Sequence, residues 1–219
     1  FAFWDALRKE HPNLAILNCA SGGRRIDLET IARGQPLWRS DYNCFPEATA
    51  ESTQDQSYGI LHWLPIQGSM IRGWSIFDKY EARCALSPGM ENALVAKTEL
   101  EWLQIKANVV QAQRCKKYFF GDYYPLTQQQ RSPAAWTAYH LYLPAEQEGM
   151  ILALRRAKSD VRAMTFDLLT IDPAKQWEFE DHDSGETWVV SGKQIREEGF
   201  KIAIPNRRDS RLIFYSVDR

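Results

Sequence analysis

Two short polar segments contain the residues of this sequence that could do chemistry. The first reads Asn-Cys-Ala-Ser-Gly-Gly over residues 18–23, and the second reads Trp-Arg-Ser-Asp over residues 38–41. Paired glycines let backbone N–H groups approach a ligand closely, and a carboxylate beside a tryptophan can act as a general acid. Simpler interpretations stay open. The first segment could be a glycine turn with a supporting Arg–Asp ion pair, and Asp41 could cap a following helix.

Each polar segment follows a short apolar run, as it would at the carboxyl end of a strand. Strands are predicted over residues 14–17, 36–41, 58–65 and 81–87, and helices over residues 1–10, 26–33, 47–57 and 91–119. Short apolar strands that alternate with helices predict a parallel α/β fold, in which active sites form at the carboxyl ends of the strands. Four such units could form half of an eight-fold barrel or a small open sheet.

The pattern changes after residue 126. Residues 128–133 are polar and turn-like, and they are predicted to be a linker. Beyond them, apolar and polar residues alternate in seven segments separated by turn signals: 136–142, 149–155, 161–168, 177–181, 187–190, 199–204 and 211–216. This spacing predicts an antiparallel β-sandwich. We therefore expect two domains, one over residues 1–126 and one over residues 127–219.

Composition limits the class of function. The chain has 219 residues, of which 44% are hydrophobic, so it can bury a sizeable core. Its 27 basic and 28 acidic residues leave a net charge of −1, which argues against binding to nucleic acid or to an anionic membrane. No apolar run reaches the roughly 18 residues that a membrane span needs. Four cysteines without metal-ligand spacing favour free thiols in a reducing compartment, so we expect a cytoplasmic location unless a preceding segment carries a signal peptide.

The stretch from Asn18 to Asp41 resembles the signature of family 36 glycoside hydrolases, which comprise the α-galactosidases and their relatives among the retaining α-glycosidases. In that signature C-x-S-G-G-x-R-x-D precedes W-x-S-D, and this sequence keeps both the order and the spacing. The resemblance continues more loosely in the predicted helix 91–119 and over residues 168–202. It implies the second half of a (β/α)8 TIM barrel over residues 1–126, followed by a C-terminal antiparallel β-sandwich over residues 127–219.

The resemblance also implies roles for individual residues. Asp41 matches the acid/base carboxylate of the family. Arg25 and Asp27 match positions that we take to support the loop after the first strand. The implied contacts to the sugar are Asn18, Cys19, Gly22 and Trp38.

A retaining glycosidase also needs a nucleophilic carboxylate, about 5–5.5 Å from the acid/base. In the family this residue lies in a Lys-x-Asp motif two strands earlier, and nothing upstream of Asn18 fits that motif. Lys158-Ser159-Asp160 has the right letters but lies in the predicted sandwich. We therefore expect the chain to be a portion of an enzyme that hydrolyses terminal α-galactosides, to be inactive by itself, and to need neither cofactor nor metal.

Two alternatives to this function stay open. The chain could be a non-catalytic sugar-binding or interaction protein, or it could come from a galactosyl transglycosidase or an α-N-acetylgalactosaminidase of the same clan. The expected partner is an α-galactoside or a related carbohydrate, with no nucleic acid and no membrane. Open sheet edges, in the half barrel or in the sandwich, predict self-association into a homo-oligomer.

Overall fold

The computed structural model describes residues 1–219 except 20–23, 46, 65, 72–75, 93–95 and 219. Its contacts form two compact units, Phe1–Thr53 with Trp63–Lys116 and Gln54–His62 with Lys117–Arg219. Helix α3 (Ala50–Leu61) runs through this division, so its first turn belongs to one unit and the rest to the other. The domain boundary after residue 126 that the sequence suggests stays a prediction.

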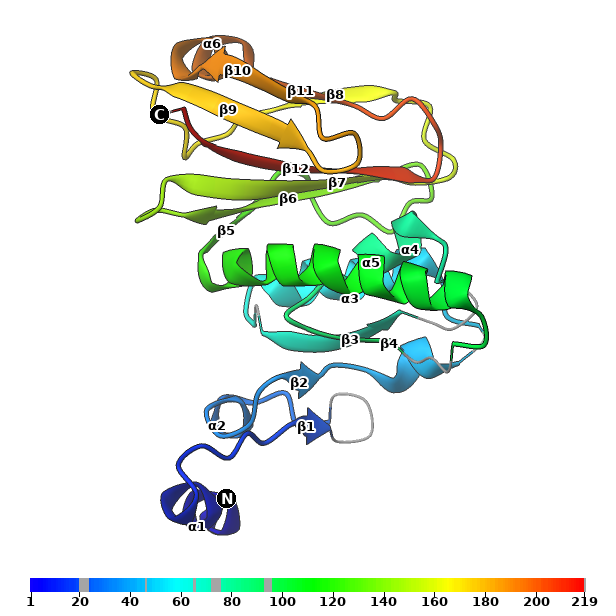
Figure 1. Cartoon of the computed structure of the whole chain (residues 1–219), viewed down its shortest axis with the longest axis vertical. Coiled ribbons are helices and arrows are strands. Elements are labelled where there is room, and N and C mark those ends of the chain that lie inside the picture. The colour runs from blue at the N-terminus through cyan, green and yellow to red at the C-terminus, as the bar shows by residue number, and fades with distance from the viewer. Residues whose placement is uncertain (20–23, 46, 65, 72–75, 93–95, 219) are drawn as a thin grey trace. The chain divides into compact units, whose positions relative to one another are not determined.

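The first unit contains a parallel sheet of four short strands in the order β1-β2-β3-β4 (Figure 1). This order agrees with the alternation of strands and helices in the sequence. The strands are β1 (Asn18–Cys19), β2 (Leu37–Trp38), β3 (Gln67–Ile71) and β4 (Gly89–Asn92). The helices are α1 (Ala2–Glu10), α2 (Leu28–Ile31), the first turn of α3, α4 (Lys79–Cys84) and α5 (Glu99–Lys116), with a 3₁₀ helix, η1 (Asp41–Cys44), after β2.

Aspartate caps determine where two of these helices begin. Asp27 accepts hydrogen bonds from the backbone N–H and the hydroxyl of Thr30, both at 2.8 Å. Asp78 accepts hydrogen bonds from the N–H groups of Tyr80 at 3.0 Å and Glu81 at 3.2 Å. Such caps satisfy N–H groups that have no partner inside the helix. They therefore set the starts of α2 and α4, and with them the lengths of the loops that lead to the strands.

Three of the strand predictions for residues 1–126 are wrong. Residues 58–61 continue α3, and residues 81–84 lie in α4, so strands β3 and β4 come later in the chain than predicted. Residues 82–87 are all buried, which explains why this helix has the unbroken apolar character of a buried strand. Residues 14–17 form no strand, because pairing with β2 begins only at Asn18.

The second unit contains an antiparallel sheet of six strands in the order β10-β9-β12-β7-β6-β5 and a separate pair, β11-β8 (Figure 1). The seven segments predicted as strands match β6 to β12, and this prediction is confirmed. Residues 128–133, predicted to be a linker, instead join β5 to β6 within one sheet. The elements are a 3₁₀ helix η3 (Lys117–Phe120), β5 (Asp122–Pro125), β6 (Trp136–Leu143), β7 (Glu148–Arg155), β8 (Ala163–Phe166), β9 (Gln176–Asp181), β10 (Thr187–Ser191), α6 (Gly192–Glu198), β11 (Phe200–Ala203) and β12 (Asp209–Val217).

Aromatic side chains form much of the core of this unit, in which the six-stranded sheet meets the β11-β8 pair. The ring centroid of Phe179 on β9 lies 4.4 Å from that of Phe200 on β11 and 5.5 Å from that of Tyr215 on β12. Stacked rings at these separations add to the stabilisation that burial alone provides. The unit therefore joins its two sheets through side chains of its own.

A buried arginine, Arg156, connects the last turns of α3 to the antiparallel sheet. Arg156 is buried, donates to Gln54 Oε1 at 2.6 Å, and forms an ion pair with Asp55. Thr137 on β6 donates to the same oxygen at 2.8 Å. The neighbouring Arg155 instead donates to backbone carbonyls, including that of Ser159 at 2.7 Å. These bonds explain why residues 54–62 group with the strands that follow them by many residues.

Candidate active site

The carboxyl ends of β1 and β2 bring the two polar segments together. Cys19 pairs in register with Trp38, and Trp38 pairs in register with Gly68 on β3. Because side chains alternate along a strand, residues in register project from the same face of the sheet. Asp41 follows Trp38 by three residues, beyond the same end of the sheet. Four of the predicted site residues therefore lie at one edge of one sheet: Asn18, Cys19, Trp38 and Asp41.

The carboxylate of Asp41 is oriented by Trp38. The indole Nε1–H of Trp38 donates to Asp41 Oδ1 at 2.9 Å. Asp41 is partly exposed, whereas Trp38 is only 7% exposed. Ser40 is the cap of η1, since its hydroxyl accepts a hydrogen bond from the N–H of Tyr42 at 3.1 Å. The capping role that was open to Asp41 thus belongs to Ser40, and the Asp41 carboxylate bonds to the indole.

Polar side chains make hydrogen bonds on both sides of residues 20–23, which follow β1. Asn18 is buried, and its Nδ2 donates to the carbonyl of Arg25 at 3.4 Å, while its Oδ1 has no partner within the described structure. Asp27 caps α2 directly afterwards. Gly22 lies in the stretch 20–23, outside the described residues. The contacts of Asn18, Cys19 and Gly22 with a sugar stay predictions.

A further carboxylate, that of Glu91, lies close enough to Cys44 for its charge to act on the thiol. Burial raises the pKa of the Cys44 thiol, and the charges of Asp41, Cys19 and Glu91 raise it further. Glu91 is exposed on β4, two residues beyond Gly89, which is in register with Gly68. Glu91 was not predicted as a site residue, because the fourth strand was predicted at 81–87 and residue 91 at the start of a helix. The correct register of β4 is the signal that would have found it.

This arrangement is suited to proton transfer. It offers a carboxylate whose orientation is fixed on one oxygen, with exposed thiols and a second carboxylate nearby. Among the described residues, no group of three or more His, Cys, Asp or Glu side chains could hold a metal ion. An oriented and partly exposed carboxylate is what general acid/base catalysis requires.

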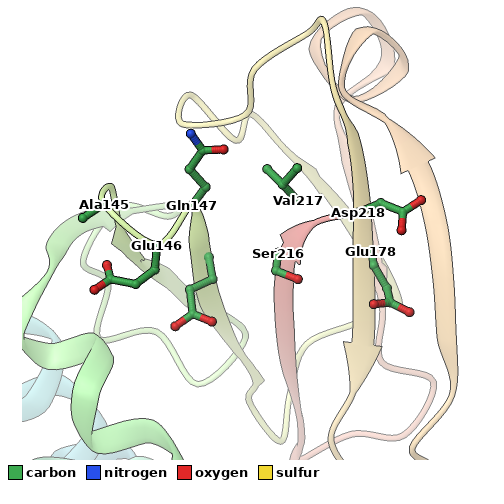
Figure 2. A pocket seen from close by; sticks show the side chains of 8 residues that line it. Ala145, Glu146, Gln147, Glu178, Ser216, Val217 and Asp218 are labelled. Carbon is green, nitrogen blue, oxygen red and sulfur yellow. The ribbon is translucent and has the colours of Figure 1, made fainter.

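A hollow of about 510 Å³ lies in the antiparallel unit (Figure 2). Figure 2 shows the carboxylates of Glu146, Glu178 and Asp218 around it. Glu148 also lines it and forms an ion pair with Lys117. Its lining contains no aromatic ring that could stack on a sugar face. None of the residues that carry the family signature lies there, so the strand-end group is the better candidate site.

The helices that the structure describes are all too short or too polar to cross a membrane. No protein-family model and no curated protein matches the sequence.

Solved structures, in contrast, match nearly the whole chain. The galactosidase domain of the α-galactosidase–sucrose kinase AgaSK has a TM-score of 0.77 at 15% identity, over 99% of this chain and 31% of its own. The α-galactosidase AgaB of Geobacillus stearothermophilus has a TM-score of 0.76 at 20% identity, over 99% of this chain and 30% of its own. A doubly substituted AgaA of the same organism, in complex with stachyose, has a TM-score of 0.78 at 19% identity with the same coverage.

The last two of these enzymes are described as members of glycoside hydrolase family 36. This chain spans about 30% of the length of the structures that it matches. The chain therefore has the fold of slightly less than a third of a family 36 α-galactosidase.

Proposed function

We propose that residues 1–219 are part of a retaining α-glycosidase that hydrolyses terminal α-galactosides, with Asp41 as its acid/base. The observation that carries this proposal is the position of Asp41 in Trp-x-Ser-Asp, beyond the carboxyl end of a parallel strand and beside the strand that ends at Cys19. The signature compares residue types over 18–41, whereas the structural match compares the backbone over 99% of the chain. Both lines of support lead to the same family.

The four parallel strands correspond, in this proposal, to the second half of a (β/α)8 barrel within residues 1–126. Residues 127–219 correspond to the C-terminal β-sandwich domain of the enzyme. The strand order supports the first assignment, because each strand of the sheet neighbours the next strand in the chain, as in a barrel. The location of the polar residues at the carboxyl ends supports it too, since barrel enzymes build their active sites there.

Asp41 has two tasks in the proposed reaction. Its protonated carboxyl gives a proton to the glycosidic oxygen as the bond to the galactosyl carbon breaks. The resulting carboxylate then takes a proton from the water that releases the galactosyl group from the enzyme. Asn18, Cys19, Gly22 and Trp38 are the proposed contacts of the sugar, and the four free cysteines support a cytoplasmic location.

The nucleophile of this proposal lies outside residues 1–219. A second carboxylate must attack the sugar from the opposite side at about 5–5.5 Å from the acid/base, and no Lys-x-Asp precedes Asn18. Asp160, in the one downstream motif of that type, forms an ion pair with Arg207 in the antiparallel unit. The isolated chain is therefore expected to bind galactose-configured ligands without turning over a galactoside.

Titration of the ¹⁵N-labelled chain with 1-deoxygalactonojirimycin tests the proposed binding. This galactose-configured amine should shift the amide signals of Cys19, Trp38 and Asp41, because its cation complements the carboxylate. Its glucose-configured counterpart and the Asp41→Asn variant are the controls. A response of equal size to both sugars, or none at millimolar concentration, would reject the galactoside assignment.

Turnover of an aryl α-galactoside by the purified chain tests the proposed place of the nucleophile. The expected rate is indistinguishable from that of an Asp41→Ala variant. Turnover that disappears in the variant would show that the nucleophile lies within residues 1–219 after all.

A further inference from the structure

The hydrogen bond between Trp38 and Asp41 has a chemical direction that the family signature does not reveal. We infer that Trp38 is a positioning residue for the acid/base: its indole occupies Oδ1 of Asp41 throughout the reaction, so that Oδ2 is the oxygen that gives and takes the proton. The inference rests on the proposed function, because it assigns a task to the acid/base of that reaction. It adds to the proposed contact of Trp38 with the sugar a second task, which rests on a bond that the structure contains.

The chemistry of the indole limits how it can bond to Asp41. Its Nε1–H can donate a hydrogen bond and cannot accept one. Oδ1 of Asp41 must therefore keep a free lone pair while the bond at 2.9 Å persists. In the neutral acid the indole bond favours the proton on Oδ2, because a carbonyl oxygen accepts a hydrogen bond better than the hydroxyl oxygen of an acid does, and in the carboxylate both oxygens are free of protons. The same indole bond is compatible with both states, so it can orient the group without taking part in the transfer.

Proton transfer then takes place entirely at Oδ2. In the first half of the proposed reaction the Oδ2–H bond breaks and the proton goes to the glycosidic oxygen, whose bond to the galactosyl carbon breaks as the nucleophilic carboxylate bonds to that carbon. In the second half a water O–H bond breaks, the proton returns to Oδ2, and the water oxygen bonds to the galactosyl carbon as the bond to the nucleophile breaks. Oδ1 neither gains nor loses a proton in either half, and Asp41 ends as it began.

The indole itself is held in place by packing. Trp38 is 7% exposed, whereas Trp63, which lies after α3, is 88% exposed. A Cβ added at Gly68 would lie 3.0 Å from Cε3 of Trp38, so the indole lies directly against the bare backbone of β3. A side chain at position 68 would have to move the ring. Gly68 therefore sets the position of the indole, and the indole sets the orientation of the carboxylate.

Ser40 adjoins Asp41 but has a different task. Its oxygen accepts the hydrogen bond from the N–H of Tyr42 and caps η1. This division of tasks accounts for three of the residue types in Trp-x-Ser-Asp: a donor to the acid, a cap for the following helix, and the acid.

The inference can be tested on the 219-residue chain without turnover. In ¹H–¹⁵N spectra the indole signal that disappears in Trp38→Phe is assigned to Trp38. This signal should lie further downfield in the wild-type chain than in Asp41→Asn, because a hydrogen bond to a carboxylate is stronger than one to a neutral amide. The indole of Trp136, which donates to the carbonyl of Val161 at 3.0 Å, is an internal control.

A second variant tests the contribution of Gly68. Gly68→Ala should move the Trp38 signal towards its position in Asp41→Asn, because the added methyl group displaces the ring from Asp41. A Trp38 signal that has the same position in the wild-type chain and in Asp41→Asn would overturn the inference. Since the measurement needs no substrate, it can fail while galactose-configured ligands still bind. It can equally succeed where they do not, which would reject only the proposed function.

Discussion

The two compact units differ in how completely each one buries its own apolar side chains. In the antiparallel unit, rings from both sheets meet in one core, in which Phe179 and Ile151 are fully buried. In the parallel unit, α1 has no buried residue, and large apolar side chains are exposed around β1 and along α5: Phe3, Leu14, Leu17, Leu28, Leu100 and Leu103. The well-buried core and the proposed active site therefore lie in different parts of this chain.

This difference accords with the proposed barrel. A strand at the edge of a parallel sheet presents unpaired backbone groups, and the helices beside it lack the neighbours that would cover them. The antiparallel strands, in contrast, find their partners within the unit, as β7 does on both of its edges, in β6 and β12. Substitutions in the two units should therefore have different kinds of effect, and the following predictions separate them.

The largest effect is expected at Asp41, and it should concern rate alone. In a full-length enzyme that contains residues 1–219, Asp41→Asn should lower turnover of a galactoside with a poor leaving group by about 10²–10⁴-fold. An aryl galactoside should lose much less, because its leaving oxygen needs little protonation. Asparagine can still accept the bond from Trp38, so urea unfolding of the chain should be unchanged. Small and equal losses for both substrates would remove Asp41 from the acid/base role.

A core substitution in the antiparallel unit should affect stability instead. Phe179→Ala removes a ring that stacks on Phe200 and Tyr215, and it should lower the free energy of unfolding by about 3–5 kcal/mol. The matched change in the parallel unit is Leu103→Ala, at an exposed position of α5. It should change the free energy by less than about 0.5 kcal/mol. Urea denaturation of both variants measures the contrast, and similar losses would contradict the comparison.

The antiparallel unit should also lose stability in mild acid because of His140. This side chain is fully buried, with its Nδ1 at 3.4 Å from the hydroxyl of Tyr215 and its ring against Tyr124. Burial lowers the pKa of His140 from 6.5 to about 4. Between these values the unfolded chain binds a proton that the folded chain does not. The histidine is therefore without effect above pH 6.5, and it should cost about 2–3 kcal/mol by pH 4.5.

Urea unfolding at pH 7.5 and pH 4.5 measures this loss. In His140→Phe the part due to the histidine should vanish, while the part due to other groups remains. Asp181 has a lowered pKa, since the N–H of Ser184 and the guanidinium of Arg211 outweigh the effect of its burial. Its contribution is lost mainly below pH 4, outside this window. An unchanged pH dependence in His140→Phe would show that the imidazole is protonated in the folded unit.

The smallest effect is expected at Trp38 and returns to the parallel unit. In the full-length enzyme, Trp38→Phe keeps an aromatic ring but removes the donor to Asp41, and kcat should fall by about 10-fold. KM should stay within about two-fold, because the lost bond orients the acid rather than the substrate. A rise in KM at constant kcat would identify Trp38 as a substrate contact instead.

Sequence predicted the antiparallel unit better than the parallel one for a physical reason. Strands β6 and β7 are eight residues long and are bounded by turns, and β9 alternates between exposed and buried residues, so length, punctuation and alternation are all visible in this unit. Strands β1 and β2 have two residues each, which is too short for any periodicity. Helix α6 was missed although its signals are present: Ser191 bonds to the N–H of Gln194 at 3.1 Å, and Gly199 ends the helix at a φ of 76°.

The candidate site was predicted only as far as residue types extend. Asp41, Cys19 and Trp38 were found because a signature specifies their letters and spacing. The bond from Trp38 to Asp41 and the place of Gly68 beneath the indole depend on strand register, which the sequence does not display. Glu91 depends on it too, and the wrong strand assignment excluded it. The sequence thus predicted site residues that lie close together along the chain. It did not predict contacts that depend on how two strands pair.

Helix α3 has a consequence for the way in which the chain is made. Gln54 and Arg156 are separated by 102 residues along the chain. At a synthesis rate of about 5–20 residues per second, the last turns of α3 leave the ribosome roughly 5–20 s before the arginine that holds them. Strands β5 and β6, which also contact these turns, emerge between the two. A nascent chain halted between α3 and β5 should therefore bind hydrophobic dyes and chaperones at residues 54–62, and it should release them once β5, β6 and Arg156 have emerged.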